Sequence, residues 1–184
     1  MDRGERSYAA YLSGDENGMV ELITLYRDGL MLYLLGFVDD MLSAEEMMED
    51  TFVRLGVRRP KYDAARASFK TFLYTIARNV ALDYKRRQRR EISIETLGDV
   101  ADERRDLERL YIRSEERLHL HRAMQQLKAE YRQVLWLVYF ENFSHKEVAR
   151  IMKKSVHSID TLIYRARNSL KAILEKEGFV YEEL

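Results

Sequence analysis

A single proline, Pro60, occurs in this chain of 184 residues, and glycine is also sparse, with 8 residues. Average usage would give about nine prolines in a chain of this length. Sandwiches and barrels of many strands need frequent tight turns, and proline and glycine supply most of them. The scarcity of both residue types therefore predicts a mostly α-helical fold.

The sequence also limits the compartment and the chemistry of the protein. It has no cysteine, which excludes disulfide bonds, thiolate metal sites and cysteine nucleophiles. No run of about 18 or more apolar residues occurs, so we expect no transmembrane helix. The acidic N-terminal segment does not have the form of a signal peptide. We therefore expect a soluble, cytoplasmic protein.

The formal net charge of zero conceals strongly charged blocks. Residues 1–57 carry a net charge of −8, and residues 58–90 carry +9. Residues 91–118 carry −4, and residues 119–184 carry +3. Such blocks indicate separate faces for different partners. The basic block is suited to nucleic acid or an anionic membrane, and a solvated helix end is the alternative.

Apolar residues at steps of three and four predict helices in the first half of the chain. One helix is expected over residues 17–37. A second is expected to start at Ser43, which with Glu46 three residues later has the form of a capping box. Its apolar stripe runs to Leu55, and Pro60 ends the segment because the residue before proline disfavours helical geometry.

A basic, loop-like stretch covers residues 56–68, and a third helix follows from Phe69. This helix ends in the cationic run 85–90, which suits the negative end of the helix dipole. Periodicity then fades in an acidic segment, residues 91–117, which we interpret as a linker with a helical piece around 107–112.

A second compact region is expected over residues 118–177, followed by a short tail, residues 178–184. Its apolar residues form stripes in three successive segments. They are Leu120, Ala123, Met124 and Leu127; then Val134, Leu135, Val138 and Tyr139; and finally Ile159, Leu162, Ile163, Ala166, Leu170 and Ile173.

The last two helices of this region have the spacing of a helix-turn-helix. Ser144 and Glu147 have the form of a capping box that opens the short helix, and Ser155 can cap the longer one. In such motifs the N-terminal part of the second helix enters the major groove. An ordinary helical hairpin is the alternative. Lys153 or Lys154 stands where the turn usually has glycine, and a left-handed lysine costs about 1 kcal/mol.

Catalytic and metal-binding motifs are lacking. The four histidines show no metal-ligand spacing, and there is no glycine-rich phosphate loop and no GxSxG motif. Glu46, Glu49 and Asp50 can share one helix face, which we interpret as a solvated acidic face rather than an acid–base pair. We predict no enzyme activity, no metal site, no cofactor and no small-molecule substrate.

Three segments resemble the bacterial sigma factors of RNA polymerase. Residues 44–55, AEEMMEDTFVRL, are similar to the polymerase-binding helix, usually DAEDLVQETF. Residues 69–87, FKTFLYTIARNVALDYKRR, are similar to the next helix, whose core reads WLYRIARNxxxDxxRR. Residues 127–174 resemble sigma domain four, including FSHKEVA and YRAR. Size and order match the extracytoplasmic-function (ECF) group, which keeps only domains two and four.

The resemblance implies an all-α protein of two small helical domains that binds core RNA polymerase and directs it to promoters. Domain two would cover residues 1–90 and domain four residues 118–177, joined by the linker. The family is commonly inhibited by an anti-sigma factor, so such a partner is implied. A helix-turn-helix repressor or activator that acts without polymerase is the alternative.

The resemblance also implies three sets of contact residues. Those facing the polymerase β′ coiled coil would be Glu45, Glu46 and Asp50. Those engaging the promoter −10 element would be Lys61, Tyr62 and Asp63, in a loop that captures a flipped base, and Arg78, Asn79, Asp83, Arg86 and Arg87 on the helix after it. Those facing the −35 element would be Ser155, His157, Ser158, Thr161 and Arg165. Asp160 and Leu162 stand where the family commonly has cations.

Overall fold

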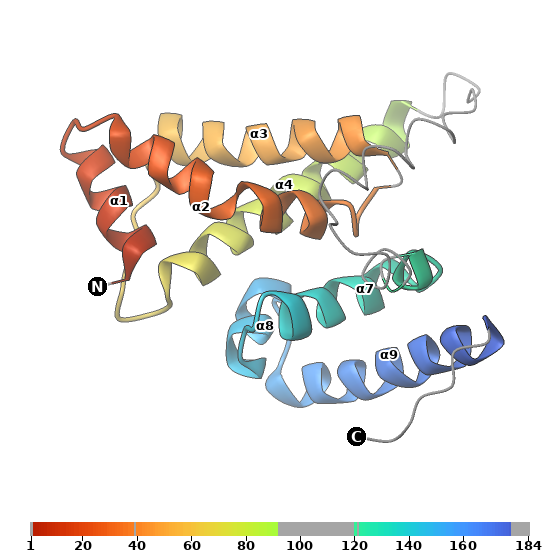
Figure 1. The fold of residues 1–184 in the computed structure, drawn as a ribbon. Coiled ribbons are helices and arrows are strands. Elements are labelled where there is room, and N and C mark those ends of the chain that lie inside the picture. The colour runs from red at the N-terminus through yellow and green to blue at the C-terminus, as the bar shows by residue number, and fades with distance from the viewer. Residues whose placement is uncertain (1, 39, 92–119, 121, 178–184) are drawn as a thin grey trace. The chain divides into compact units, whose positions relative to one another are not determined.

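The computed structural model describes residues 2–38, 40–91, 120 and 122–177. Within this part of the chain the regular structure is helical and contains no strand, so the all-α prediction is confirmed. The chain divides into two compact units. The first holds α1–α4, and the second holds α7, η1, α9 and most of α8 (Figure 1). The predicted linker beyond Glu91, its helical piece and the tail lie outside the described residues.

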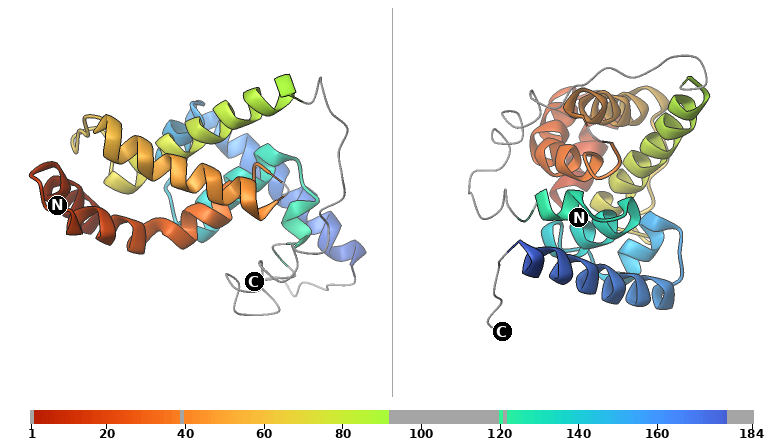
Figure 2. Two further views of the ribbon diagram at one scale, coloured as in Figure 1. Left: turned by 90° about the horizontal axis from the view of Figure 1, so that it is seen from above. Right: turned by 90° about the vertical axis from the view of Figure 1, so that its right-hand side faces the viewer.

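The first unit contains four helices, α1 (Arg3–Leu12), α2 (Asn17–Leu34), α3 (Met41–Arg58) and α4 (Phe69–Glu91). Helix α2 packs against α1 and α3, and α4 packs against α3 and α2. Figure 2 shows the same helices from two further sides. Fully buried side chains between them include Leu22, Leu30, Met31, Leu34, Met47, Leu55, Leu73, Ala77 and Val80.

Helix α1 was not anticipated from the sequence. It begins after Asp2, whose side chain accepts a hydrogen bond of 2.8 Å from the backbone N–H of Glu5. It then packs closely on α2 at Gly18, where an added Cβ would lie 2.3 Å from the carbonyl oxygen of Ser7. The close approach of the two helices therefore requires glycine at this position.

The capping box predicted at Ser43 and Glu46 is wrong. The residue that caps α3 is Asp40, whose side chain accepts a hydrogen bond of 2.7 Å from the backbone N–H of Ser43. Ser43 itself is buried, and its hydroxyl lies 2.7 Å from the hydroxyl of Tyr84 on α4. Aspartate and serine both cap a helix by accepting from a backbone N–H two or three residues later, so the local sequence allowed a start at either residue.

The loop after α3 is shorter than predicted. Helix α3 continues through Gly56 to Arg58, and the chain turns at Arg59, which has a left-handed backbone with φ of 43°. Pro60 follows directly, in agreement with its predicted role as the end of the helical segment. Helix α2 likewise ends at Leu34 rather than at Phe37.

The second unit contains α7 (Ala129–Leu135), the π-helical turn η1 (Trp136–Phe140), α8 (His145–Met152) and α9 (Val156–Lys176). Helix α7 packs against α9. The buried residues on α9 are Ile159, Leu162, Ile163, Ala166 and Leu174, so the predicted stripe is largely correct. Leu170 and Ile173 are only half-buried.

The π-helical turn changes which residues reach the core. The sequence predicted Val138 and Tyr139 on the apolar face, but Trp136 and Leu137 are buried and Tyr139 is 51% exposed. A π-helix has more residues per turn than an α-helix, so the buried face shifts along the sequence. The indole ring of Trp136 stacks on the ring of Phe140 with their centroids 4.3 Å apart.

The helix-turn-helix signals are borne out in the geometry. Ser144 and Glu147 form the reciprocal bonds of a capping box, with 2.9 Å from the Ser144 N–H to the Glu147 carboxylate. Ser155 caps α9 by accepting from the N–H of Ser158 at 3.1 Å. Between the helices Lys153 has a φ of 55°, so it is this lysine that takes the left-handed conformation.

Replacing Lys153 by glycine is expected to stabilise the second unit by about 1 kcal/mol, because glycine adopts this backbone conformation without a steric penalty. The chain has one tryptophan, Trp136, so its fluorescence during urea unfolding reports on this unit. Lys154→Gly is the matched control. The Lys154 ammonium lies 2.9 Å from Glu130, so this variant should be destabilised. Equal shifts for the two variants would contradict the assignment of strain to Lys153.

Candidate functional site

One face of α3 presents acidic and apolar side chains together. Residues 42, 46, 49, 53 and 57 follow one another at steps of three and four, so they form a single stripe on the helix. Glu46 and Glu49 on this stripe are exposed. Leu42, Val53 and Val57 are 70%, 55% and 78% exposed. We call these five residues the α3 stripe.

The predicted polymerase-binding residues are all on α3 but differ in exposure. Glu46 belongs to the α3 stripe, whereas Glu45 is half-buried. Asp50 lies beside the stripe and already has an internal partner, since its carboxylate is 3.2 Å from the guanidinium of Arg54. The sequence reasoning missed the apolar members of the stripe, although their helical spacing with Glu46 and Glu49 was a usable signal.

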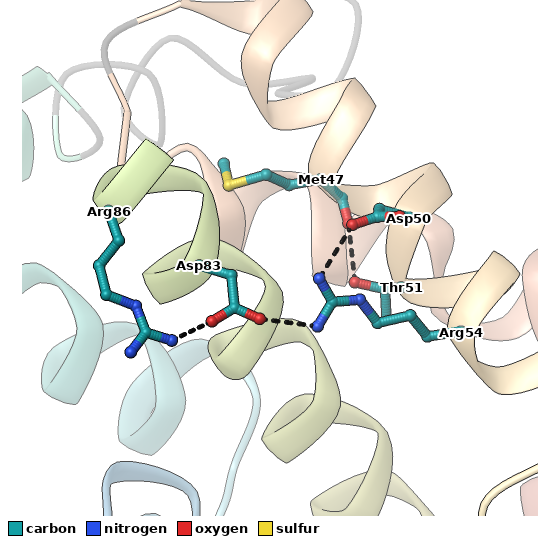
Figure 3. A network of polar contacts seen from close by, with 6 residues as sticks. All are labelled: Met47, Asp50, Thr51, Arg54, Asp83 and Arg86. Atoms are coloured by element: carbon teal, nitrogen blue, oxygen red, sulfur yellow. Dashed lines mark hydrogen bonds and ion pairs between the residues drawn. The ribbon is translucent and has the colours of Figure 1, made fainter. Parts of the chain in front are cut away.

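Four charged side chains form a chain of ion pairs between α3 and α4 (Figure 3). Arg54 on α3 binds Asp50 on its own helix, and it reaches across to Asp83 on α4 at 2.9 Å. Asp83 in turn accepts a hydrogen bond from Arg86, one turn further along α4. Arg54 is the most enclosed of the four, with 20% of its side chain exposed. We call these four residues the ion-pair network.

The ion-pair network lowers the pKa of Asp83. Hydrogen bonds from Arg54 and Arg86 hold the pKa of this carboxyl below its ordinary value of 3.8, against the opposing effect of burial. Asp83 and Arg86 were predicted to contact −10 DNA, and the structure gives both of them internal partners. Arg54 was not predicted, because only the packing of α3 against α4 brings it to Asp83.

The loop between α3 and α4 holds the three residues predicted to capture a base. Lys61 and Asp63 are exposed, and the Asp63 side chain accepts a hydrogen bond of 3.0 Å from the N–H of Ala65. Tyr62 is half-buried: its ring lies 5.6 Å from Phe69 and 5.4 Å from Phe72. Its hydroxyl donates a hydrogen bond of 3.0 Å to the carbonyl of Ala67.

The remaining predicted −10 residues are spread along α4. Arg87 is exposed near its C-terminal end. Arg78 and Asn79 are half-buried in its middle, and the Nε of Arg78 is buried without a hydrogen-bond partner. Burial raises the pKa of the Tyr33 phenol, while the positive charge of Arg78 opposes that rise. Arg78 is therefore partly enclosed within the unit.

The predicted −35 residues lie at the start of α9 and face outward in most cases. Ser155, His157, Ser158 and Arg165 are exposed, whereas Thr161 is half-buried and its hydroxyl donates to the carbonyl of His157 at 3.1 Å. The hydroxyls of Ser155 and Ser158 lie 2.8 Å apart. Both serines therefore have local partners at the cap of the helix.

Two departures from the family pattern have different structural meanings. Leu162 is buried, so its side chain belongs to the core and not to the outward face. Asp160 is exposed, and its carboxylate lies 2.6 Å from Nδ1 of His145 on α8. The Asp160 carboxylate on α9 therefore has a hydrogen-bond partner on α8, the other helix of the helix-turn-helix.

Within the described part of the chain, no group of three or more histidine, cysteine, aspartate or glutamate side chains could hold a metal ion. None of the described helices is both long and apolar enough to cross a membrane.

Replacing Asp83 by asparagine should lower the free energy of unfolding of the first unit by about 1 kcal/mol at neutral pH, since two partly exposed ion pairs are lost. The folded pKa of Asp83 lies below 3.8, so this stabilisation is present above that pH and is lost as the pH falls through the folded pKa. The difference between wild type and variant should therefore shrink in strong acid.

Urea unfolding followed by helical circular dichroism at several pH values measures this difference. The fluorescence of Trp136 reports on the second unit and should be unaffected. Asp28→Asn, at an exposed position of α2, is the matched control. A stability difference that stays constant down to strong acid would show that Asp83 acts by packing and not by charge.

Two family models match this chain. The model described as sigma-70 region 2 matches residues 22–91, and the model described as sigma-70, region 4 matches residues 117–170. Together they cover more than half of the chain, and their order agrees with the order of the two units.

Similar proteins of known function are sigma factors. The ECF RNA polymerase sigma factor SigM of Bacillus subtilis is 27% identical over 158 residues, which cover 85% of this chain and 94% of SigM. The ECF RNA polymerase sigma factor BldN of Streptomyces coelicolor is 27% identical over 180 residues, covering 97% of this chain and 67% of BldN.

Two solved structures share the fold. CnrH, determined in complex with the cytosolic domain of CnrY, has a TM-score of 0.68 at 21% identity, over 95% of this chain and 99% of CnrH. RpoE of Bartonella quintana, determined with the anti-sigma factor NepR, has a TM-score of 0.66 at 21% identity, over 84% of this chain and 95% of RpoE. On the family matches and these relatives, the chain belongs to the sigma-70 family, in its ECF group, whose members bind core RNA polymerase and direct it to promoters.

Proposed function

We propose that this ECF sigma factor binds polymerase, the −10 element and the −35 element through three separate surfaces. The α3 stripe with Glu45 and Asp50 binds a basic surface of core polymerase. The loop 59–68 and the basic end of α4 engage the −10 element, and the start of α9 reads the −35 element. The observation that carries the proposal is the presence, in one unit, of an exposed acidic stripe on α3 and an exposed basic end on α4.

The chemistry of the α3 stripe supports its assignment. Its two glutamates can pair with cations, and the three exposed apolar side chains at positions 42, 53 and 57 can be buried by a partner. Such a mixed surface suits a protein partner better than a nucleic acid, which would be repelled by the carboxylates. A repressor that acts without polymerase has no use for this surface, so that alternative is not favoured.

The basic end of α4 supports the second assignment. Arg86, Arg87, Arg89 and Arg90 are exposed there. Arginines at phosphates supply affinity without sequence information, whereas side chains at base edges supply specificity. In this proposal Lys61 and Asp63 meet the base, and Asp83 acts indirectly by holding Arg86. Arg78 and Asn79, which are half-buried, act by bracing α4 beneath the DNA.

The division into domains follows the same reasoning. We assign residues 1–90 to sigma domain two and residues 118–177 to sigma domain four, with residues 91–117 as the acidic connection. Each domain alone offers few DNA contacts, so polymerase must hold both on one promoter to raise their effective concentration. The protein would act in the cytoplasm, where it meets core polymerase, and would have no catalytic residues of its own.

An anti-sigma factor is proposed as the regulatory partner. Structures of CnrH with the cytosolic domain of CnrY, and of Bartonella RpoE with the anti-sigma factor NepR, support such a partner for a protein of the same fold.

The first test concerns polymerase binding. Glu46→Lys should weaken the affinity for core polymerase about tenfold or more, because the new ammonium would face a basic partner. Asp50 is avoided as a first choice because its replacement would also disturb Arg54. Asp28→Lys on α2 makes the same charge change at another exposed position of the first unit and should leave the affinity unchanged. Equal affinity for both variants would mean that the α3 stripe is only solvated surface.

The second test compares the two DNA surfaces in holoenzyme. Arg87→Ala should weaken binding similarly on all promoter sequences and make the log–log salt slope shallower by about 0.7 to 0.9, the loss of one phosphate contact. Arg165→Ala should instead reduce discrimination by roughly 1–3 kcal/mol between a promoter and its −35-scrambled form.

Holoenzyme binding to both templates at several salt concentrations gives the two quantities. The −35 assignment of α9 fails if Arg165→Ala loses the same affinity on both templates. The phosphate role of Arg87 fails if its salt slope equals that of the wild type.

A further inference from the structure

Helix α1 contacts the loop that leads into α4, although α1 lies outside the region matched by the family model. Its Tyr8 hydroxyl donates a hydrogen bond of 2.8 Å to the carbonyl of Pro60. One helical turn later its Tyr11 hydroxyl donates a hydrogen bond of 3.1 Å to the carbonyl of Gly56. Two tyrosines of α1 therefore bind backbone atoms at the point where α3 ends and the loop begins.

The position of each carbonyl in the chain explains why its hydrogen bond from a tyrosine matters. Pro60 has no backbone N–H, so its carbonyl is the only backbone group by which it can be held. Gly56 lies in the last turn of α3, where carbonyls have no partner within the helix. The guanidinium of Arg59, the left-handed residue between them, lies 5.3 Å from the centre of the Tyr11 ring.

Aromatic rings connect α1 to Tyr62, which lies between the two loop residues proposed to meet the base. The Tyr8 ring lies 5.2 Å from Phe69 and 6.3 Å from Phe72 at the start of α4. Tyr62 of the loop packs on the same two phenylalanines. Tyr8 and Tyr62 thus share two neighbours, and the position of Tyr62 depends on the surface that Tyr8 helps to form.

Helix α1 is itself firmly placed. Tyr8 is buried, and Gly18 allows α2 to approach the backbone of α1 closely. The Ser7 hydroxyl also lies 2.6 Å from the carboxylate of Glu21 on α2. A helix fixed in this way can hold a loop in one conformation before any DNA arrives.

We propose that Tyr8 and Tyr11 are positioning residues for base capture at the −10 element. They fix the conformation of residues 59–68, and with it the placement of Lys61, Tyr62 and Asp63, without touching DNA themselves. This inference rests on the proposed function of that loop. A loop that must be ordered during binding recognises its base less selectively than one that is ordered beforehand.

The test uses Tyr8→Phe, Tyr11→Phe and the double variant, which keep the rings and remove only the hydroxyl groups. Holoenzyme is reconstituted with core polymerase, and a promoter is recovered from genomic DNA by selection with wild-type holoenzyme. Binding is then measured on this promoter, on its single-base −10 variants and on its −35-scrambled form. The double variant should lower the discrimination between −10 sequences about three- to tenfold, which is the loss expected for one or two hydrogen bonds.

Two other quantities should stay at their wild-type values in the double variant: the affinity for core polymerase and the discrimination against the −35-scrambled promoter. A merely structural role for the two hydroxyls would lower all three together, and that result would overturn the proposal. Unchanged −10 discrimination would overturn it as well. Tyr139→Phe, which removes a hydroxyl from an exposed tyrosine of the second unit, is the matched control and should change nothing.

Lys61→Ala with Asp63→Ala separates this inference from the function on which it rests. If these loop variants alter −10 discrimination and the α1 variants do not, the positioning role of α1 fails while the loop keeps its proposed function. If the loop variants also leave −10 discrimination unchanged, the assignment of the loop to base capture fails.

Discussion

The ion pairs of Arg54 connect α3 and α4, the two helices that carry the proposed polymerase and −10 surfaces. Arg54 binds Asp50 on α3 and Asp83 on α4, and Asp83 also binds Arg86. A cation shared by two carboxylates is worth more here than on an open surface, because 20% of its side chain is exposed. The proposed polymerase surface on α3 and the proposed DNA surface on α4 are therefore joined by one guanidinium, in addition to the packing of the two helices and the contact of Ser43 with Tyr84.

The segregation of charge along the sequence becomes a segregation of surfaces in the fold. Helix α3 comes from the acidic block and α4 from the basic one. The ion-pair network lies where these two helices pack together. Carboxylates next to a DNA-binding helix would normally weaken its attraction for phosphates. Pairing Asp50 and Asp83 with arginines removes much of that repulsion, while Glu46 and Glu49 stay exposed on the α3 stripe for a different partner.

The sequence predicted what depends on local patterns and missed what depends on packing. Helical spacing identified α3, α4 and α9, and Ser144 and Ser155 were correctly interpreted because capping is local. The left-handed turn was expected at Lys153 or Lys154, and the structure places it at Lys153. Helix α1 was missed although Asp2 followed by Glu5 was a usable start signal. Arg86, three residues from Asp83, is a local partner, but Arg54 could not be predicted as a partner because it is distant in sequence. The π-helical turn after α7 also moved Tyr139 away from the apolar face to which strict α-helical spacing had assigned it.

Helix α9 is the proposed −35 surface, and in this proposal it need not bind DNA tightly. Asp160 adds a negative charge to the outward face of α9, and its carboxylate lies 2.6 Å from Nδ1 of His145 on α8. Ser155 and Ser158 are engaged at the helix cap, whereas His157 and Arg165 are the exposed residues of the predicted −35 set that take no part in that cap. A sigma factor does not need tight binding at each element, because polymerase holds both DNA-binding units on one promoter and multiplies two modest affinities.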